Sequence, residues 1–452
     1  MTNEERDALQ RLSGALAIPT LSAENAAPEM ARFAAFRDYL RRSFPLVHKE
    51  LSCEVAGGDS LLYTWRGGEG KPFALLAHQD VVPVEEGTEK DWTHPPFAGT
   101  FDDTYIWGRG ASDVKCLLLA ELEAVETLLM AGYKPDRDIY LAFGHNEEII
   151  AGGGGSGAGA IAALLESRGV RLEFVLDEGG AVITDSFMGL PKPIAAIGVS
   201  EKGYCDFMIS VEGDGGHSSE PPNVTAAAKL AKIILAAKPG KARLTAATEG
   251  MLKTIGRNKT GLLGFILRHP RGFWPVLRAV FLRDKQTAAM MRTTCTPTML
   301  NASPQANVLP QMASVTFNSR ILPGDNVDEL IAGLVAKAER MGFKVHAKKL
   351  RGNPPPKETS QDTDTYRRLS GLAASAFGAI PVAYLVMGGT DSREYARVAD
   401  ELYRFCPFEL SRSELSAMHS TNERLRCDSY IKGIQFLKTF ILQSSGGQAD
   451  GK

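Results

Sequence analysis

The chain has 452 residues, of which 44% are hydrophobic and 23% are charged, and its net charge is -2. This length predicts two or three domains, and the near-neutral charge gives no support for a nucleic-acid or anionic-membrane partner. No segment reaches the ~18 uninterrupted apolar residues of a transmembrane helix. The six cysteines form no CxxC pair and the N-terminus lacks the apolar core of a secretory signal, so a reducing, cytoplasmic compartment is expected.

The first 200 residues alternate helical and strand patterns. Helical periodicity of apolar residues occurs at 4–17, 28–43, 112–131 and 158–168. Apolar, β-rich runs lie at 73–78, 139–144, 173–177 and 193–199. This alternation predicts an α/β domain with a substantially parallel sheet, in which loops at the carboxyl ends of the strands carry the ligands.

The pattern changes after Ser200. A strand and turn at 205–219 are followed by helix 223–237, strand 313–322, helix 326–341 and strand 343–350. This order predicts a smaller α+β domain at 201–350. Helix 362–377, strand 380–386 and helix 424–442 then resume the first pattern. The second domain is therefore expected to be inserted within the first, which comprises 1–200 and 351–452.

A long segment at 250–292 enlarges the inserted domain. It is rich in Leu, Phe, Trp and Met, with basic residues interleaved. Three interpretations remain open for it: extra helices that pack on the inserted domain, an apolar surface for a fatty or aromatic acyl group, or amphipathic attachment to a membrane surface.

The apolar run 73–78 ends in a histidine, His78, and Asp80 follows two residues later. Alternate side chains of a strand share one face, so the two residues can touch. A metal-binding imidazole usually donates its second N–H to a carboxylate. A histidine that is merely satisfied by its neighbour would give the same pattern.

Other acidic residues and a second histidine occupy comparable places. Glu147 and Glu148 follow an apolar strand, where two uncompensated charges are costly, and Asp177 closes another strand. Asp113 precedes a helical run, and His419 lies in a polar loop before the last helix. Taken singly, each has an ordinary explanation: a solvated turn, a carboxylate at a helix N-terminus, or a surface histidine.

In this order, the motifs resemble those of the di-zinc peptidase and amidohydrolase family, which includes glutamate carboxypeptidase, carnosinase-type dipeptidases and aminoacylase. The resemblance covers nearly the whole chain and is strongest to the branch of Gly-X carboxypeptidase and N-acyl-amino-acid hydrolases. It is carried by FALLAHQDVVPV, WGRGASDVK, GHNEE, VLDEGG, VSEKGYCDFMISVEGDGGHSSEPP, NVLP, FNSRILPG, GGTDSREY and MHSTNERL. It implies a mixed-sheet α/β catalytic domain with an inserted α+β lid and dimerisation domain.

The resemblance implies two zinc ions, for which Co²⁺ or Mn²⁺ can substitute. The implied ligands are nitrogen and oxygen donors: His78 and Asp177 for one ion, Glu148 and His419 for the other, and Asp113 bridging both. Asp80 would orient His78, and Glu147 would be the general base. A cis peptide bond is expected after Asp113, although Val114 replaces the acidic residue or Met that is common in relatives.

The resemblance also implies how substrate is held. His217 would stabilise the tetrahedral oxyanion, reaching in from the partner subunit of a homodimer. The terminal carboxylate would be bound by residues from three further motifs: Asn307, Arg320, Gly388, Gly389 and, in addition, Thr390 or Arg393.

These roles imply hydrolysis of the amide bond next to a free C-terminal carboxylate, in short peptides or N-acyl amino acids. An aminoacylase with little peptidase activity shares all the chemistry, so the motifs cannot choose between the two. Two other classes remain. One is a metal-free binding relative, and the other is a nucleotide-binding protein that uses the glycine run AGGGGSGAG at 151–159, which lacks the Lys-Ser/Thr of a Walker loop.

Overall fold

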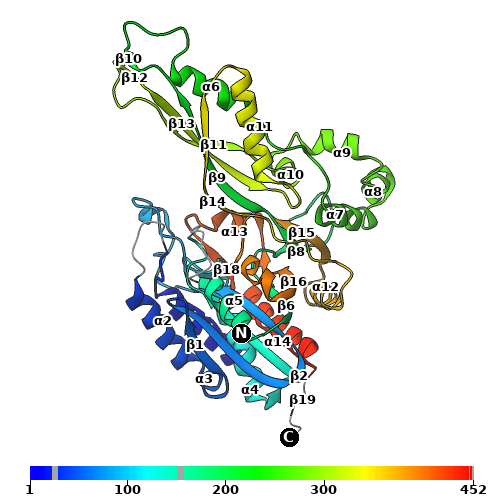
Figure 1. The fold of residues 1–452 in the computed structure, drawn as a ribbon. Coiled ribbons are helices and arrows are strands. Elements are labelled where there is room, and N and C mark those ends of the chain that lie inside the picture. Colours follow the sequence, from blue (N-terminus) through cyan, green and yellow to red (C-terminus); the bar gives the residue numbers. More distant parts are fainter. Residues whose placement is uncertain (23–28, 150–156, 447, 450–452) are drawn as a thin grey trace.

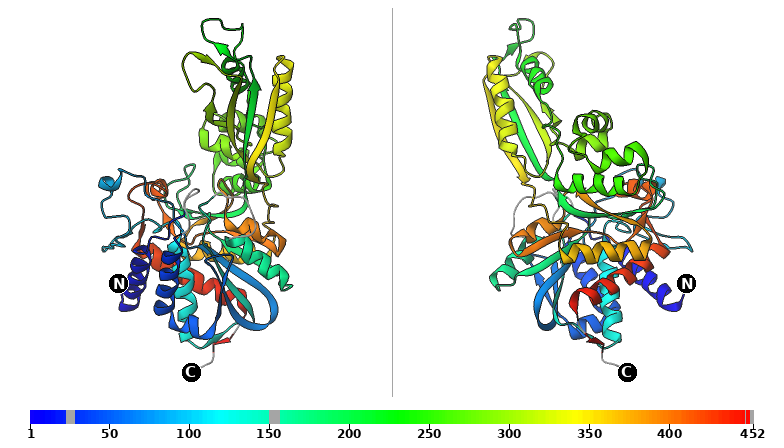
Figure 2. Two further views of the ribbon diagram at one scale, coloured as in Figure 1. Left: turned by 60° about the vertical axis from the view of Figure 1, so that its left-hand side comes forward. Right: turned by 90° about the vertical axis from the view of Figure 1, so that its right-hand side faces the viewer.

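The computed structural model describes residues 1–22, 29–149, 157–446 and 448–449. Two parts are visible in Figures 1 and 2: a large α/β body that carries both termini, and an arm that projects from it. Most of the glycine run at 151–159, on which the nucleotide-binding alternative rests, lies outside the described residues.

A mixed sheet forms the centre of the body. Its strands are β1 (Ser52–Ala56), β2 (Ser60–His78), β5 (Arg137–Gly144), β6 (Leu172–Asp177), β7 (Val182–Ile183), β8 (Ile194–Glu201), β15 (Ile380–Val386), β16 (Ala399–Arg404) and β17 (Glu409–Leu410). They are ordered β1-β2-β6-β16-β8-β7-β17, with β5 beside β2 and β15 beside β8. Pairing is parallel for β2 with β6, β6 with β16 and β8 with β15, and antiparallel where β7 and β16 meet β8.

Helices cover both faces of this sheet. The body helices are α1 (Asn3–Leu16), α2 (Met30–Ser43), α3 (Pro45–Glu50), α4 (Lys115–Met130), α5 (Gly157–Ser167), α12 (Asp364–Phe377), α13 (Arg412–Ala417) and α14 (Cys427–Ser445), with 3-10 turns η1 (Glu89–Asp91) and η2 (Asp391–Arg397). Short strand pairs join β3 (Tyr105–Trp107) to β18 (Arg424–Arg426) and β4 (Tyr133–Lys134) to β19 (Gln448–Ala449).

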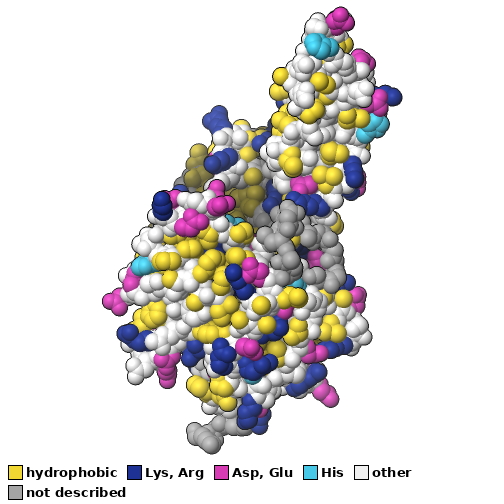
Figure 3. All heavy atoms as spheres, turned by 90° about the vertical axis from the view of Figure 1, so that its left-hand side faces the viewer, with side chains coloured by type: hydrophobic (Ala, Val, Ile, Leu, Met, Phe, Trp, Pro, Cys, Tyr) yellow, Lys and Arg dark blue, Asp and Glu magenta, His cyan; other side chains and the backbone are white. Residues whose placement is uncertain are grey.

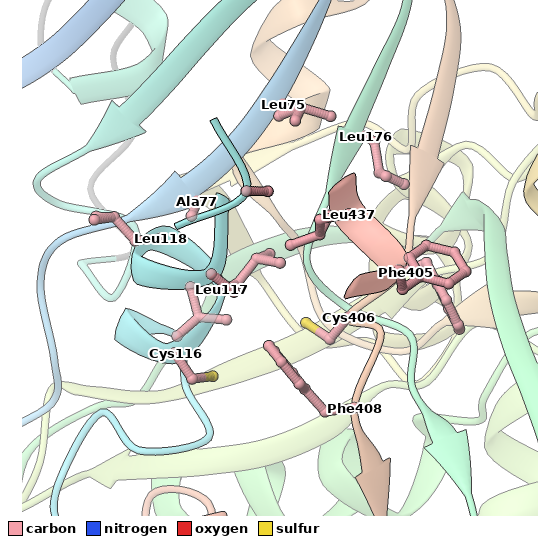
Figure 4. Close-up of a cluster of buried hydrophobic side chains, with 14 of the residues drawn as sticks. Leu75, Ala77, Cys116, Leu117, Leu118, Leu176, Phe405, Cys406, Phe408 and Leu437 are labelled. Atoms are coloured by element: carbon pink, nitrogen blue, oxygen red, sulfur yellow. The ribbon is translucent and has the colours of Figure 1, made fainter. Parts of the chain in front are cut away.

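Neighbouring residues of β2 enter different cores. Leu75 and Ala77 pack with α1, α4 and α14, and part of this core is drawn in Figure 4. Ala74 and Leu76 pack on the other side with α5 and η2. Because side chains alternate along a strand, burial on both faces explains why the strands read as continuous apolar runs.

The arm is a second sheet of four strands, ordered β11-β13-β9-β14. Its elements are β9 (Gly203–Glu212), β10 (Gly216–His217), α6 (Ala226–Ala236), β11 (Thr296–Asn301), β12 (Val308–Leu309), β13 (Met312–Ile321), α11 (Val327–Arg340) and β14 (Val345–Asn353). Phe207, Ile209 and Val211, alternate residues of β9, are buried beneath α6 and α11. The short β10–β12 pair lies at the outer end of the arm (Figure 1).

Four further helices follow α6: α7 (Ala246–Arg257), α8 (Gly261–Arg268), α9 (Trp274–Phe281) and α10 (Lys285–Met290). The first interpretation of segment 250–292 expected these helices to pack on the inserted domain, but they pack on the body sheet instead. Leu252 and Ile255 of α7 are buried with Ile194 of β8 and Val382 of β15. That interpretation is wrong because β8 and β15 present an apolar sheet face on the body, and these helices remove it from water.

The fold class predicted from the sequence is confirmed: a mixed-sheet α/β body contains an inserted α+β part. None of the described helices is both long and apolar enough to cross a membrane. Figure 3 shows basic and acidic side chains interspersed on one face of the body, as the near-neutral net charge leads one to expect.

Candidate metal centre

The centre lies where neighbouring strands of the body sheet end. His78 is the last residue of β2, which runs beside both β6 and β5. His78 is paired with Gly144, the end of β5, so Glu147 and Glu148 follow directly. Carboxyl ends of parallel strands meet at one sheet edge, which is why residues far apart in sequence converge here.

Four predicted metal ligands come together at this edge. The ligand atoms of His78, Asp113 and Glu148 all lie within 4.8 Å of one another. His419 Nε2 is 2.9 Å from Asp113 Oδ2 and 3.0 Å from Glu148 Oε1, while Asp113 Oδ1 is 3.3 Å from His78 Nε2. The Asp113 carboxylate therefore lies between the two histidines, as a bridging ligand would. The peptide bond between Asp113 and Val114 is cis, as predicted.

The hydrogen bonding of His78 fits a metal ligand. Its Nδ1 lies 2.9 Å from the backbone carbonyl oxygen of Asp80, to which it donates. Its Nε2 is buried and faces Asp113 Oδ1 at 3.3 Å without a well-formed hydrogen bond among the described residues. An imidazole whose N–H is held by one acceptor presents the lone pair of its other nitrogen to a metal. Nitrogen and oxygen donors without cysteine suit a divalent ion in a hydrolytic site.

Asp80 connects His78 to the glutamate pair. The backbone N–H groups of Glu147 and Glu148 donate to the Asp80 carboxylate, at 3.2 and 3.1 Å. Asp80 Oδ1 is 3.5 Å from His78 Nδ1, so the carbonyl of Asp80 is the closer acceptor for that ring. The predicted orienting role thus falls mainly to the backbone of Asp80, and its side chain fixes the loop that carries both glutamates.

Glu423 holds the loop of Asp113, a contact that the sequence analysis missed. Its buried carboxylate Oε1 accepts from the backbone N–H groups of Gly110, Ser112 and Asp113 at 2.9, 3.0 and 3.2 Å. Its Oε2 accepts from Arg109 at 2.6 Å. Glu423 lies four residues after His419, so it ties the two ligand loops together. No signal in the letters NERL marks this role, because a glutamate in a polar loop is normally solvated.

The carboxylate of Asp177 is engaged by the backbone. Both of its carboxylate oxygens accept backbone N–H bonds, from Glu178 at 2.8 Å and from Ser392 at 2.6 Å. The next residue, Glu178, faces the centre instead: it lines a cavity together with Asp113. Burial raises the pKa of Glu178 well above its usual value, and the charges of Asp113 and Glu147 raise it further. In the sequence, the only available signal was that adjacent side chains at a strand end point in different directions. That signal does not reveal whether Asp177 or Glu178 points to the site.

The carboxylates of the centre disfavour one another's charge. Burial raises the pKa of Glu147 well above its usual value, and the negative charges of Glu148 and Asp113 add to the effect, while His78 opposes it. Hydrogen bonds to Asp113 and Glu148 raise the pKa of His419 to about 10. Cations placed among these groups would offset the repulsion and restore the ionised carboxylates.

His217 and Asn307 lie at the outer end of the arm, away from this centre (Figure 1). His217 is exposed, and its Nδ1 is 2.7 Å from the hydroxyl of Ser219. The backbone oxygen of Asn307 accepts from Ser218 N–H at 3.1 Å, so the two predicted residues are neighbours. Within one chain the structure does not bring either of them to the metal ligands.

Arg320 lies at the base of the arm, where its guanidinium carbon is 5.0 Å from the centre of the Tyr204 ring. A different arginine, Arg393, lies near Glu147, whose charge acts on it. Arg393 Nε is buried and makes no hydrogen bond among the described residues, although the carboxylate of Glu394 lies 3.7 Å away. Of the two guanidinium groups, that of Arg393 is the one on which the charge of Glu147 acts.

Gly388 and Gly389 follow β15 and precede η2. A Cβ at Gly389 would come within 2.2 Å of the Arg393 guanidinium, so the glycine makes room for that side chain. Thr390 is buried, and its hydroxyl donates to Glu201 at 2.9 Å. This hydrogen bond gives the Thr390 hydroxyl a structural partner within the fold.

A cavity of about 180 Å³ adjoins the centre. Asp113 and Glu178 lie at its polar side. The remaining wall is largely apolar and includes Ile183, Ala196, Tyr384, Leu410, Leu415 and Met418.

Comparison with known proteins gives one consistent result. The sequence pattern of peptidase family M20/M25/M40 matches residues 74–443. The chain is 36% identical to "Probable carboxypeptidase S-like 2" of Dictyostelium discoideum, over 89% of this chain and 78% of that protein. It is 34% identical to the mouse "N-fatty-acyl-amino acid synthase/hydrolase PM20D1", over 97% of this chain and 88% of that protein. The crystal structure of the M20 family metallo-carboxypeptidase Sso-CP2 from Sulfolobus solfataricus has the same fold, with a TM-score of 0.69 and 18% identity, covering 98% of this chain and 99% of that one.

Proposed function

Because this chain belongs to peptidase family M20/M25/M40, we propose that it is a metal-dependent hydrolase of the amide bond next to a free C-terminal carboxylate. Its substrates would be short peptides or N-acyl amino acids. The observation that carries the proposal is the convergence of His78, Asp113, Glu148 and His419 around one bridging carboxylate. The names of the carboxypeptidase and acyl-amino-acid hydrolase relatives support the same reaction.

The proposed cofactor is a pair of zinc ions. We assign His78 and Glu178 to one ion, Glu148 and His419 to the other, and Asp113 to both. When bound, the ions supply Lewis acidity that polarises the substrate carbonyl and lowers the pKa of the attacking water. Glu178 replaces Asp177 in this assignment, because both oxygens of Asp177 already accept backbone hydrogen bonds.

Glu147 is the proposed general base. It stands next to the ligand Glu148, and its backbone is fixed by Asp80. Burial and neighbouring carboxylates raise its pKa, so it holds a proton more readily than an exposed glutamate does. It would take the proton of the attacking water and pass it to the leaving amine.

The substrate's carboxylate would meet Arg393, whose Nε is buried beside the site and makes no hydrogen bond among the described residues. Guanidinium binds a carboxylate through two parallel hydrogen bonds. Arg320 and Asn307 would contribute only when the arm, or the arm of a second subunit, approaches the body. We propose that the arm, which lies largely within residues 201–350, serves as this lid and dimerisation domain. Its edge strand β11 is exposed throughout, with Met299 and Leu300 at 68% and 66% exposure, and thus offers a surface for pairing.

The cavity beside the centre favours N-acyl amino acids as one substrate class. Its largely apolar wall suits an acyl chain or an apolar side chain. Hydrolysis rates with acyl chains of increasing length would test this assignment. A rate that does not depend on the chain length would remove it.

One experiment tests the proposed reaction. The purified protein, supplied with Zn²⁺, Co²⁺ or Mn²⁺ in turn, is given an N-acyl amino acid, a dipeptide and the C-terminal amide of each. Hydrolysis of the free acids but not of the amides, abolished by chelator and restored by metal, is expected. Equal cleavage of acids and amides would contradict the role of the free carboxylate.

A further inference from the structure

Two short helices carry an apolar surface that faces solvent. Leu262, Leu263 and Phe265 of α8 are 74%, 47% and 45% exposed, and Val276 and Val280 of α9 are 55% and 54% exposed. We call these five residues the α8–α9 patch. Phe265 lies 5.8 Å from the ring of Phe273, between the two helices, so the two halves of the patch adjoin. Clustered apolar exposure of this kind marks a binding surface more often than isolated exposed residues do.

The patch is separate from the surface that holds the helices to the body. Leu267 of α8 and Leu277 and Phe281 of α9 are buried in the core that includes Ile194 and Val382 of the body sheet. Leu262 and Phe265 are three residues apart and Val276 and Val280 four, so each pair lies on one side of its helix. Each helix therefore has a second apolar face, which anchoring to the body does not require.

Basic residues surround the patch. Residues 257–285 contain seven Lys or Arg residues and one acidic residue, in a chain whose net charge is -2. Among the described residues, Arg278 and Arg283 have no ion-pair partner, and both are exposed. The single acidic residue, Asp284, caps α10 by accepting from the N–H groups of Gln286 and Thr287. Even with Arg271 paired to Glu249 of α7, basic residues exceed acidic ones in this segment, although the whole chain is nearly neutral.

We propose that the α8–α9 patch docks on an anionic lipid surface. Apolar side chains would enter the boundary between headgroups and acyl chains, and the surrounding Lys and Arg side chains would contact the anionic headgroups. The charge distinguishes this occupant from a second copy of the chain, because two such patches would place their basic residues against one another. The inference rests on the surface of α8 and α9 alone and does not depend on the proposed hydrolase activity.

The core beneath the patch links it to the body. Ala196 and Tyr384, which line the cavity beside the metal centre, also pack in or against the core that anchors α8 and α9. The docking surface and the cavity are thus built on the same strands, β8 and β15. A hydrolase held in this way would work at the surface where amphiphilic N-acyl compounds gather.

Vesicle sedimentation of the full chain tests the proposal. Vesicles of phosphatidylcholine alone are compared with vesicles that contain equal amounts of phosphatidylglycerol, at low and high salt. We expect binding to the anionic vesicles, weakened by salt because surface charges are screened. The triple variant Leu262→Ser, Phe265→Ser, Val280→Ser should bind at least about tenfold more weakly. The pair Arg278→Glu and Arg283→Glu should remove the preference for anionic lipid.

Matched controls on the arm separate a specific patch from general stickiness. Leu235→Ser replaces an equally exposed leucine, at 76%, and Lys348→Glu replaces an exposed lysine; both should bind as the parent does. Thermal unfolding of each variant shows that it is folded. Equal vesicle binding by the parent and the triple variant would overturn the proposal. So would the absence of vesicle binding together with a concentration-dependent dimer that the triple variant abolishes.

Discussion

The metal centre and the outer end of the arm differ in how firmly the chain holds them. At the centre, Asp80 fixes the loop of Glu147 and Glu148, and Glu423 fixes the loop of Asp113. At the arm's outer end, His217 is exposed on a two-residue strand and is bonded only to its neighbour Ser219. The comparison teaches that the body can gather the proposed metal ligands by itself, whereas the oxyanion contact predicted for His217 would have to arrive from outside it.

The largest effect is expected from removing the base within the firmly held region. Glu147→Gln keeps the size and the backbone contacts of the residue but cannot take up a proton, so kcat should fall by about 10³-fold. Metal content, measured by elemental analysis, should stay at the parent's value because Glu147 is not a proposed ligand. A variant that retains more than about a tenth of the activity would show that the base lies elsewhere.

A test of the arm comes next. His217→Ala should lower kcat by about 10²–10³-fold if its ring stabilises the oxyanion, although the residue touches no proposed ligand within its own chain. Mixing this variant with Glu147→Gln should restore activity to about a quarter of the parent's, because half of the randomly formed dimers would each contain one complete site.

That recovery is the decisive control for the origin of His217. If the mixture stays as inactive as its components, while gel filtration shows that subunits exchange, the histidine does not act across a dimer. His217 would then have to reach the centre of its own chain, by closure of the arm onto the body.

Variants of Asp177 and Glu178, at the end of β6, test which of the two residues is the metal ligand. Glu178→Gln should weaken binding of one metal ion by about 100-fold, because loss of a residue that only hydrogen-bonds to a ligand already costs up to about that much. Asp177→Asn should keep both metal ions but lower stability by about 1–3 kcal/mol, because one of two backbone N–H groups loses its acceptor. Titration with Zn²⁺ and thermal unfolding distinguish the two, and a metal deficit in Asp177→Asn alone would reverse the assignment.

The smallest effect is expected at Glu423, which touches no proposed metal ion. Glu423→Gln should lower metal affinity by about 10–100-fold, because the loop of Asp113 loses its charged acceptor. Raised metal concentration should recover most of the kcat, which distinguishes a positioning residue from a catalytic one. A loss of kcat that excess metal does not repair would contradict the positioning role.

Much of the body could be predicted from the sequence. The apolar runs that become β2, β5 and β6 are continuous because both sheet faces are covered, and short runs of this kind between helical periodicities leave few alternatives. The positions of His78 and of the pair Glu147 and Glu148 followed from the same strands, since residues directly after parallel strands share one edge of a sheet.

The rest depended on contacts between segments far apart in the chain. The sequence by itself determined the strand–helix order and the acids and histidines at the strand ends, because these follow from local periodicity. Only the tertiary structure decided that Glu178 shares a cavity with Asp113 while Asp177 accepts backbone hydrogen bonds. It also decided that Glu423 holds the loop of Asp113 and that α7–α10 cover the body sheet. It also gathered basic and apolar residues of α8 and α9 into one surface that a net charge of -2 conceals, because an average over the chain carries no information about which side chains share a face.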